Sequence, residues 1–395
     1  MQKLTYPRII IKQDRLASIS RRHPWIFSKG IQSKEDVQDG DLVSVHDPAG
    51  HFLASGHYHD SSIAIRILSF DQPHIDQSFW DGTIAKCLTR RKKMFLPTNG
   101  TNAYRLVHGE GDNLSGLIID IYDQVAVVQC HTIGMHRSLN QIEAALRANL
   151  GAETVIFDKS KNALPPAYAK QQSDGFITGN KADLVIEENH NKFSIDLALG
   201  QKTGFFLDQR DNRKLLSYYA KDQKILNLYC YTGGFSVYAL NAGAKEVCSI
   251  DVSARAMDTL TENLKLNKID NHRHQSIIGD VKKILPDLPD QTYDIIVVDP
   301  PAFAKSQFKS HNAVQAYKRI NAMAISKVKP GGLIFTFSCS QVIDQTLFQN
   351  TITAAAIESG RDCRILHILS QAPDHPISIF HPEGKYLKGL VLEVE

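Results

Sequence analysis

The chain has 395 residues, a length that is typical of two or three domains. Its content of 43% hydrophobic and 22% charged residues is ordinary for globular proteins and excludes a disordered or fibrous chain. The net charge is only +3, so a nucleic-acid partner requires that the positive side chains be clustered.

Signals for export, membrane insertion and metal binding are all weak. The first fifteen residues, MQKLTYPRIIIKQDR, hold no apolar core of signal-peptide length, and no apolar run approaches the roughly 20 residues that span a bilayer. The six cysteines are scattered and form no C-x-x-C pair, while His57 and His59 lack a third ligand in register. We therefore expect a cytoplasmic protein with free thiols, no bound metal and no membrane partner.

Residues 1–72 predict a small β-domain. The alternating segments Leu42–His46 and Phe52–Tyr58 flank a tetrapeptide, 47–50, that has Pro second and Gly fourth, as a type I turn prefers. Residues 63–70 alternate again. Several short strands separated by turn residues are typical of a compact barrel.

Residues 73–182 predict a middle domain of mixed helix and strand. The expected elements are a helix at 79–93, a hairpin at 117–122 and 125–131, and an amphipathic helix at Leu139–Leu150 that Gly151 ends. Residues 159–181 are polar and hold two consecutive prolines, so we interpret them as a loop or boundary.

Residues 183–395 predict an α/β domain with a doubly wound, Rossmann-like sheet. The expected strands are 224–228, 247–251, 275–279, 294–299, 333–338, 364–369 and 387–394, and the expected helices are 235–242, 254–267, 314–328 and 345–359. Residues 295–298 are continuously apolar, as a strand covered on both faces must be. Because such sheets bind ligands beyond the carboxyl ends of their strands, functional residues should follow each strand.

The first three strand ends describe a nucleoside pocket. After the first strand comes Tyr231-Thr232-Gly233-Gly234-Phe235, whose glycines allow a close backbone approach to a ligand but equally suit a tight strand-to-helix turn. Asp251 ends the second strand, where a carboxylate can accept ribose hydroxyls, and Asp280 follows the third, within reach of an adenine amino group. Each acid alone is more often a helix cap.

The fourth and fifth strand ends carry reactive groups. Asp299 precedes Pro300-Pro301, which force a stiff, extended exit that fixes the carboxylate. Cys339 lies between Ser338 and Ser340 at the edge of the predicted ligand face, although a buried structural thiol is the alternative interpretation.

These residues in this order resemble class I S-adenosylmethionine-dependent methyltransferases, and more closely the ribosomal large subunit methyltransferase I family. The similar segments are RHPWIFS at 22–28, KTGFFLDQR at 202–210, YTGGF at 231–235, DPP at 299–301, SCS at 338–340 and PEGKYLKG at 382–389. The family arrangement implies an RNA-binding PUA domain at 1–72, a middle domain at 73–182 and a methyltransferase domain at 183–395.

The resemblance implies methyl transfer from S-adenosylmethionine to carbon 5 of a cytosine in large-subunit ribosomal RNA. In that chemistry Cys339 is the nucleophile that adds to carbon 6, and Asp299 donates a hydrogen bond to nitrogen 3. Another class of RNA cytosine methyltransferases carries a second cysteine after the fourth-strand proline, and this chain has none there. The base for the carbon-5 proton is therefore open; His375 is one loop histidine that we consider.

The resemblance also implies which side chains hold the cofactor. Asp251 is expected at the ribose, Asp280 at the adenine and the loop at 231–235 under the methionine half. Asp208 and Arg210 are expected at the methionine amino and carboxylate groups, although Arg210 could instead form an ion pair on the helix surface. The predicted cofactor-binding set is Asp208, Arg210, Tyr231, Thr232, Gly233, Gly234, Phe235, Asp251, Asp280 and Asp299.

Two basic runs are candidates for contact with the ribosomal RNA phosphates, because the target base must leave its stack at a cost that other contacts can offset. The predicted RNA-binding residues are Arg21, Arg22, Trp25, Arg90, Arg91, Lys92 and Lys93. A solvated helix face is the alternative for the run at 90–93, and the sequence leaves a homodimer open.

Three other functions remain open at this point. DPPAF also suits a nucleic-acid amino-methyltransferase that needs no thiol; the chain could be a non-catalytic RNA-binding assembly factor; and a nicotinamide dehydrogenase could share the α/β frame. The absence of G-x-G-x-x-G disfavours the dehydrogenase.

Overall fold

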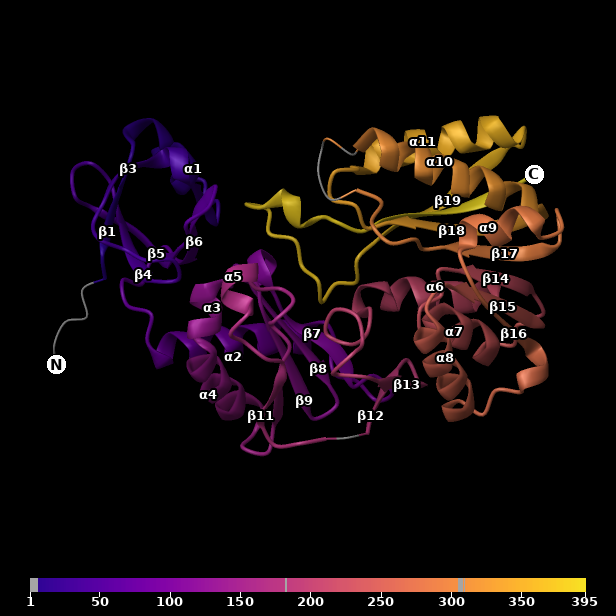
Figure 1. Ribbon diagram of the computed structural model, residues 1–395, viewed down its shortest axis with the longest axis horizontal. Helices are drawn as coiled ribbons and strands as arrows, with labels where there is room; N and C mark the ends of the chain where they lie inside the picture. Colours follow the sequence, from indigo (N-terminus) through magenta and orange to yellow (C-terminus); the bar gives the residue numbers. More distant parts are fainter. Residues whose placement is uncertain (1–5, 182, 305–307, 309) are drawn as a thin grey trace. The chain divides into compact units, whose positions relative to one another are not determined.

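The computed structural model describes residues 6–181, 183–304, 308 and 310–395, and its chain folds as two compact units. The first unit comprises Met1–Ile186, Ile195–Leu207 and Pro373–Gly384, and the second comprises Glu187–Ser194, Asp208–Ala372 and Lys385–Glu395. The chain therefore passes between the units several times instead of once. Figure 1 shows the elements of each unit.

The first unit begins with a six-stranded sheet in the order β2-β6-β5-β4-β1-β3. Its elements are β1 (Arg8–Ile11), α1 (Leu16–Ser20), β2 (Trp25–Phe27), β3 (Ile31–Lys34), β4 (Leu42–His46), β5 (Phe52–Tyr58) and β6 (Ile63–Ser69). The predicted turn between β4 and β5 is present, since the Gly50 N–H donates to the Asp47 carbonyl at 3.0 Å. Alternate side chains such as Val43, Val45 and Ile65 form the core.

A second sheet of the first unit has the order β11-β10-β9-β8-β7. Its elements are α2 (Gln77–Lys93), β7 (Ala103–His108), β8 (Leu117–Tyr122), β9 (Val125–Cys130), α3 (Ile133–Arg137), α4 (Leu139–Leu150), β10 (Val155–Asp158), α5 (Pro166–Ala169) and β11 (Gly175–Thr178). Residues of α2 and α4 share one core with the sheet. The interpretation of 159–181 as a loop is wrong for α5 and β11, because pairing with β10 makes a strand of a segment too short to show a pattern.

After β11 in chain order, β12 (Leu184–Glu188) and β13 (Asn191–Ile195) form a two-stranded sheet. The second unit is built on a seven-stranded sheet in the order β16-β15-β14-β17-β18-β20-β19. The first five strands of this order are parallel, and β20 is antiparallel to both of its neighbours. This is the doubly wound architecture that the sequence predicts.

All seven predicted strands and all four predicted helices of the second unit are present. The elements are α6 (Arg210–Tyr219), β14 (Lys224–Leu228), α7 (Gly234–Asn241), β15 (Glu246–Asp251), α8 (Ala254–Leu266), β16 (His274–Ile278), α9 (Val281–Ile284), β17 (Tyr293–Val298), α10 (Ser310–Lys327), β18 (Val328–Ser338), α11 (Gln345–Ser359), β19 (Cys363–Ser370) and β20 (Lys388–Val394). Of these, α6 and α9 were not predicted. Helices α7 and α8 lie on one side of the sheet, and α10 and α11 on the other (Figure 1). Covering on both faces explains why residues 295–298 of β17 are continuously apolar and buried.

No helix within the described ranges is both long and apolar enough to cross a membrane.

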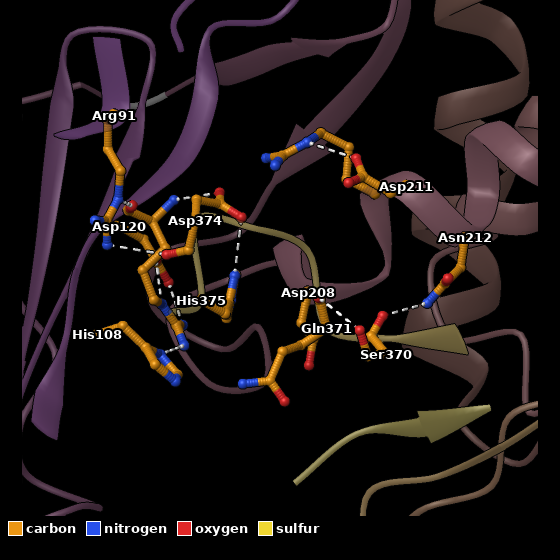
Figure 2. Close-up of polar contacts among 12 residues, drawn as sticks. Arg91, His108, Asp120, Asp208, Asp211, Asn212, Ser370, Gln371, Asp374 and His375 are labelled. Carbon is orange, nitrogen blue, oxygen red and sulfur yellow. Dashed lines mark hydrogen bonds and ion pairs between the residues drawn. The ribbon is translucent and has the colours of Figure 1, made fainter. Parts of the chain in front are cut away.

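A buried ion pair ties α2 to the second sheet of the first unit. The Arg91 side chain is 0% exposed and pairs with Asp112, and its Nε donates to the Arg105 carbonyl at 2.7 Å. Its Nη2 also donates to the Asp374 carbonyl, from the segment that returns late in the chain (Figure 2). Removing one partner of such a pair leaves the other charge buried without compensation.

We expect Arg91→Met to lower the free energy of unfolding by roughly 3–5 kcal/mol, because Asp112 loses its main buried partner. Urea denaturation followed by circular dichroism measures this. The matched control is Arg90→Met: Arg90 also pairs with Asp112, but its side chain is 38% exposed, so a loss below about 1 kcal/mol is expected. Equal losses in the two variants would contradict this account.

Candidate active site

Strand β15 of the seven-stranded sheet ends in a carboxylate whose two oxygens both accept hydrogen bonds. Asp251, the last residue of β15, accepts the Tyr231 N–H on Oδ2 and the Ser253 N–H on Oδ1, each at 2.9 Å. Hydrogen bonds from two backbone amides set the direction of the carboxylate. Each oxygen keeps a further lone pair, which suits a vicinal pair of ribose hydroxyls.

The turn after β14 is shaped by packing. Gly233 has φ of +79°, and a Cβ there would lie 2.6 Å from the Leu260 side chain on α8. Only glycine combines that backbone with such a close approach. The Thr232 carbonyl accepts the Asn263 amide at 2.9 Å, and Phe235 is buried against Phe337. The predicted loop is therefore held rigidly, with the first N–H groups of α7 at its end.

Asp280 is exposed and caps a helix. Its Oδ1 accepts the Lys282 N–H at 3.0 Å at the start of α9. This is the capping role that the sequence left open beside adenine recognition, and the two uses are compatible because the carboxylate has a second oxygen.

Asp299 follows directly after β17, and its pKa is strongly shifted. Gln209 donates its amide to Oδ2 at 3.0 Å. Burial and the nearby negative charge of Asp208 raise the pKa of Asp299 to about 7. The carboxyl therefore exists as both acid and anion near neutral pH, and the acid form can donate a hydrogen bond. Gln209 was missed as a site residue, although it lies in the quoted segment at 202–210.

Asp208 has one occupied and one unsatisfied oxygen. The Tyr386 hydroxyl donates to Oδ2 at 2.7 Å, whereas Oδ1 is buried and has no hydrogen-bond partner among the described residues. A buried carboxylate oxygen left in this way is costly unless a ligand donates to it. The ammonium of a methionine moiety is such a donor, so this group fits the cofactor end assigned to Asp208. Arg210 is nearly buried, and its Nε lies 3.5 Å from Asp211 Oδ1.

Cys339 comes directly after Ser338, the last residue of β18, and its side chain is partly exposed. Cys87, Cys130, Cys230 and Cys248 are buried, and Cys363 is partly exposed at the start of β19. Beside the thiol, the Tyr317 hydroxyl and the Ser340 hydroxyl are 3.1 Å apart. Because β17 and β18 are parallel neighbours, the residues that follow them, Asp299 and Cys339, reach the same edge of the sheet.

The predicted RNA-binding residues differ in exposure. Arg21, Arg22, Lys92 and Lys93 are exposed, while the Trp25 indole N–H donates to Glu110 at 2.9 Å and the ring is partly buried. The prediction for Arg91 is wrong, because its guanidinium is buried against Asp112 and does not reach solvent. Periodicity alone did not show that one residue of a basic run turns inward.

His375 belongs to the first unit and is buried. Its Nδ1 lies 3.0 Å from Asp374 Oδ1, as Figure 2 shows, and its ring lies 5.1 Å from that of His108. Figure 2 also shows Asn212 donating to the Ser370 carbonyl in the second unit. His375 is therefore hydrogen-bonded and packed within the first unit.

We expect Asp251→Ala to weaken S-adenosylmethionine binding by about 10- to 100-fold, the loss expected for hydrogen bonds to a charged group. Isothermal titration calorimetry measures the dissociation constant. Asp258→Ala is the control, because Asp258 is an exposed acid on α8 and its loss should leave affinity unchanged. Unaltered affinity in Asp251→Ala would remove this residue from the cofactor site.

The chain is similar to known proteins over nearly its whole length. The model of the S-adenosylmethionine-dependent methyltransferase family matches residues 105–376, and that of the PUA-like domain matches residues 9–70. The ribosomal RNA large subunit methyltransferase I of Aeromonas salmonicida is 41% identical over 391 residues, covering 97% of this chain and 98% of that protein. The protein of that name from Vibrio vulnificus is 37% identical, and the match covers 98% of this chain and 99% of that protein.

Solved structures share the fold at low identity. A Streptococcus mutans S-adenosylmethionine-dependent methyltransferase superimposes with a TM-score of 0.82 at 21% identity, covering 98% of this chain and 99% of that chain. The methyltransferase SMU.776, solved in complex with SAH, has a TM-score of 0.84 at 22% identity and the same coverage. The family model and the full-length relatives, not these structures, show that the cofactor is S-adenosylmethionine and that the chain belongs to the ribosomal RNA large subunit methyltransferase I family.

Proposed function

We propose that this protein transfers a methyl group from S-adenosylmethionine to carbon 5 of a cytosine in large-subunit ribosomal RNA through a transient bond to Cys339. The observation that carries the proposal is that a partly exposed thiol, Cys339, and the carboxyl of Asp299, whose pKa is raised by burial, follow the neighbouring parallel strands β18 and β17. The names of the full-length relatives support the ribosomal RNA substrate.

The thiol is needed because carbon 5 of cytosine must be activated before it can accept a methyl group. Carbon 5 of cytosine is a poor nucleophile, unlike an exocyclic amine. The thiolate of Cys339 adds to carbon 6, forming an S–C6 bond and moving the 5,6 double-bond electrons toward carbon 5, which can then attack an electrophilic methyl group. After transfer a base takes the carbon-5 proton, the S–C6 bond breaks and the double bond returns.

Asp299 assists the addition of the thiolate by contacting a different atom of the cytosine ring, nitrogen 3. As the neutral acid it donates a hydrogen bond to nitrogen 3, where negative charge develops when the thiolate adds. The raised pKa of Asp299 keeps a substantial fraction of the carboxyl protonated near neutral pH. Gln209 holds Oδ2, so the carboxyl keeps one direction whichever form is present.

S-adenosylmethionine, when bound, supplies the electrophilic methyl carbon. Asp251 would accept the ribose hydroxyls, and the unsatisfied oxygen of Asp208 would accept the methionine ammonium. Tyr386 orients Asp208 through its hydroxyl. Arg210, Asp280 and the 231–235 loop remain proposed contacts of the same cofactor.

We propose that the RNA strand contacts two groups of exposed arginines and lysines. Each group lies a few residues from an exposed phenylalanine. In the first domain Arg21 and Arg22 are exposed, as is the ring of Phe27; after α2, Lys92 and Lys93 precede the exposed Phe95. Cations that bind phosphate beside rings that stack on bases are typical of single-stranded RNA surfaces. Arg90 and Trp25 are already engaged with Asp112 and Glu110, so we give them a secondary part.

Replacing Cys339 tests the covalent step. We expect Cys339→Ala to lower methyl transfer to ribosomal RNA by at least about 1,000-fold, because no other thiol takes its place. The assay uses labelled S-adenosylmethionine and protein-free ribosomal RNA, with mass mapping of the product. Cys363→Ala is the control and should keep nearly full activity. Retained turnover in Cys339→Ala would favour the amino-methyltransferase that the sequence left open.

The protonation of Asp299 predicts a pH dependence. The acid form is present below a pKa of about 7 and is lost above it, so single-turnover rates at saturating S-adenosylmethionine should fall with rising pH through that range. Asp299→Asn should abolish this descending limb and lower the rate by roughly 100-fold, since a neutral amide donates a weaker hydrogen bond to nitrogen 3 than a carboxylic acid does. Asp208→Asn should move the limb to lower pH by removing a like charge. A limb that persists in Asp299→Asn would assign it to another group.

A further inference from the structure

Lys388 is a buried cation in a mostly apolar strand. It begins β20, and its side chain is among the largest that are fully buried, at 1% exposure. Its Nζ donates to the Ser340 carbonyl and to the Tyr386 carbonyl, each at 2.7 Å. Within the part of the chain that the structure describes, no carboxylate lies within ion-pair distance of Lys388.

A second buried lysine of the same unit, in contrast, has a carboxylate that compensates its charge. Lys327, at 7% exposure, donates to the Pro286 and Leu288 carbonyls and also forms an ion pair of 2.7 Å with Asp290. Each lysine donates hydrogen bonds to two backbone carbonyls, but of the two only Lys327 also forms an ion pair with a carboxylate. Burial accordingly lowers the pKa of Lys388 to about 8. A buried ammonium of this kind needs a negative charge from elsewhere.

The group that can supply this charge is Cys339. Lys388 pairs across the sheet with Ser338, the residue before the cysteine, and its ammonium bonds the carbonyl of Ser340, the residue after it. A charged Cys339 is the largest influence that opposes the effect of burial on Lys388. Lysine and thiol are therefore within electrostatic reach of each other at one edge of the sheet.

The other ionisable groups near this pair come from separate elements. Asp344, the cap of α11, raises the pKa of Lys388, and Lys385, before β20, lowers it. From α10, Tyr317 faces the same thiol, and a negative Cys339 contributes to the raised pKa of that phenol. Tyr317 is neutral at physiological pH, so Lys388 is the cation that favours the thiolate.

We propose that Lys388 is a positioning residue for Cys339: its buried ammonium stabilises the thiolate and, through the Ser340 carbonyl, holds the segment that carries it. The inference rests on the proposed function of Cys339 as the nucleophile. Opposite charges in a poorly solvated environment favour ionisation of a thiol, and thiolate is the form that attacks carbon 6. The lysine itself forms no covalent bond and contacts no substrate.

The test measures the ionisation of Cys339 without RNA or cofactor. The full-length protein is alkylated briefly with iodoacetamide across a range of pH, and modification of the peptide that contains Cys339 is followed by mass spectrometry. In the unaltered protein the midpoint should lie below the ordinary thiol value of about 8.5. A midpoint at or above that value would overturn the proposal without any variant.

Variants then assign the effect. Lys388→Met should raise the Cys339 midpoint by at least about one pH unit, a roughly 10-fold fall in alkylation rate at pH 7, and Lys388→Arg should restore most of it. Cys363 is the internal control, because its profile should stay the same in every variant. Lys327→Met is the matched lysine control, since it removes a buried ammonium away from the thiol. An unchanged Cys339 profile in folded Lys388→Met would overturn the proposal.

Methyl transfer adds a readout that separates the two proposals. Relative to the unaltered protein at the same pH, the rate of Lys388→Met should be depressed at pH 7 and closer to equal at pH 9, because higher pH forms the thiolate without the lysine; a merely structural defect would leave this ratio unchanged. The alkylation result stands apart from turnover. An unshifted midpoint overturns the role of Lys388 alone, whereas turnover by Cys339→Ala overturns the nucleophile itself.

Discussion

The pairing of β18 with its two neighbours is the constraint on which the site depends. Parallel pairing with β17 brings the carboxyl ends of both strands to one edge, so Asp299 and Cys339 emerge together. Antiparallel pairing with β20 brings the amino end of that strand to the same edge, so Lys388 arrives beside them. A fully parallel sheet would place the beginning of its last strand at the opposite edge.

Burial of charge is the second theme of the site. Asp299 is pushed toward its neutral acid by burial and by Asp208, while burial pushes Lys388 toward its neutral amine. Two buried arginines elsewhere in the chain are instead compensated by ion pairs: Arg91 pairs with Asp112, and Arg213 pairs with Glu188. Groups whose charge is poorly compensated in the folded protein therefore gather where the chemistry is proposed, as active sites commonly arrange.

Much of this site was predictable from local pattern. Asp251, Asp280, Asp299 and Cys339 each follow a strand whose composition marks it clearly, and a doubly wound sheet brings strand ends together whatever the details of packing. Gln209, Tyr386 and Lys388 were missed because each acts through a hydrogen bond to a residue far away in sequence or on another strand. The inward orientation of Arg91 was hidden for the same reason, since its partner lies outside α2.

The amino-acid sequence by itself determined the family, the α/β class and the strand ends that carry acids and a thiol, because these depend on hydrophobic periodicity and on short contiguous motifs. Only the tertiary structure decided which cations face solvent, which carboxyl is held partly protonated and which lysine lies beside the thiol. Those properties depend on burial and on pairing between distant segments, and neither is written in the local order of residues.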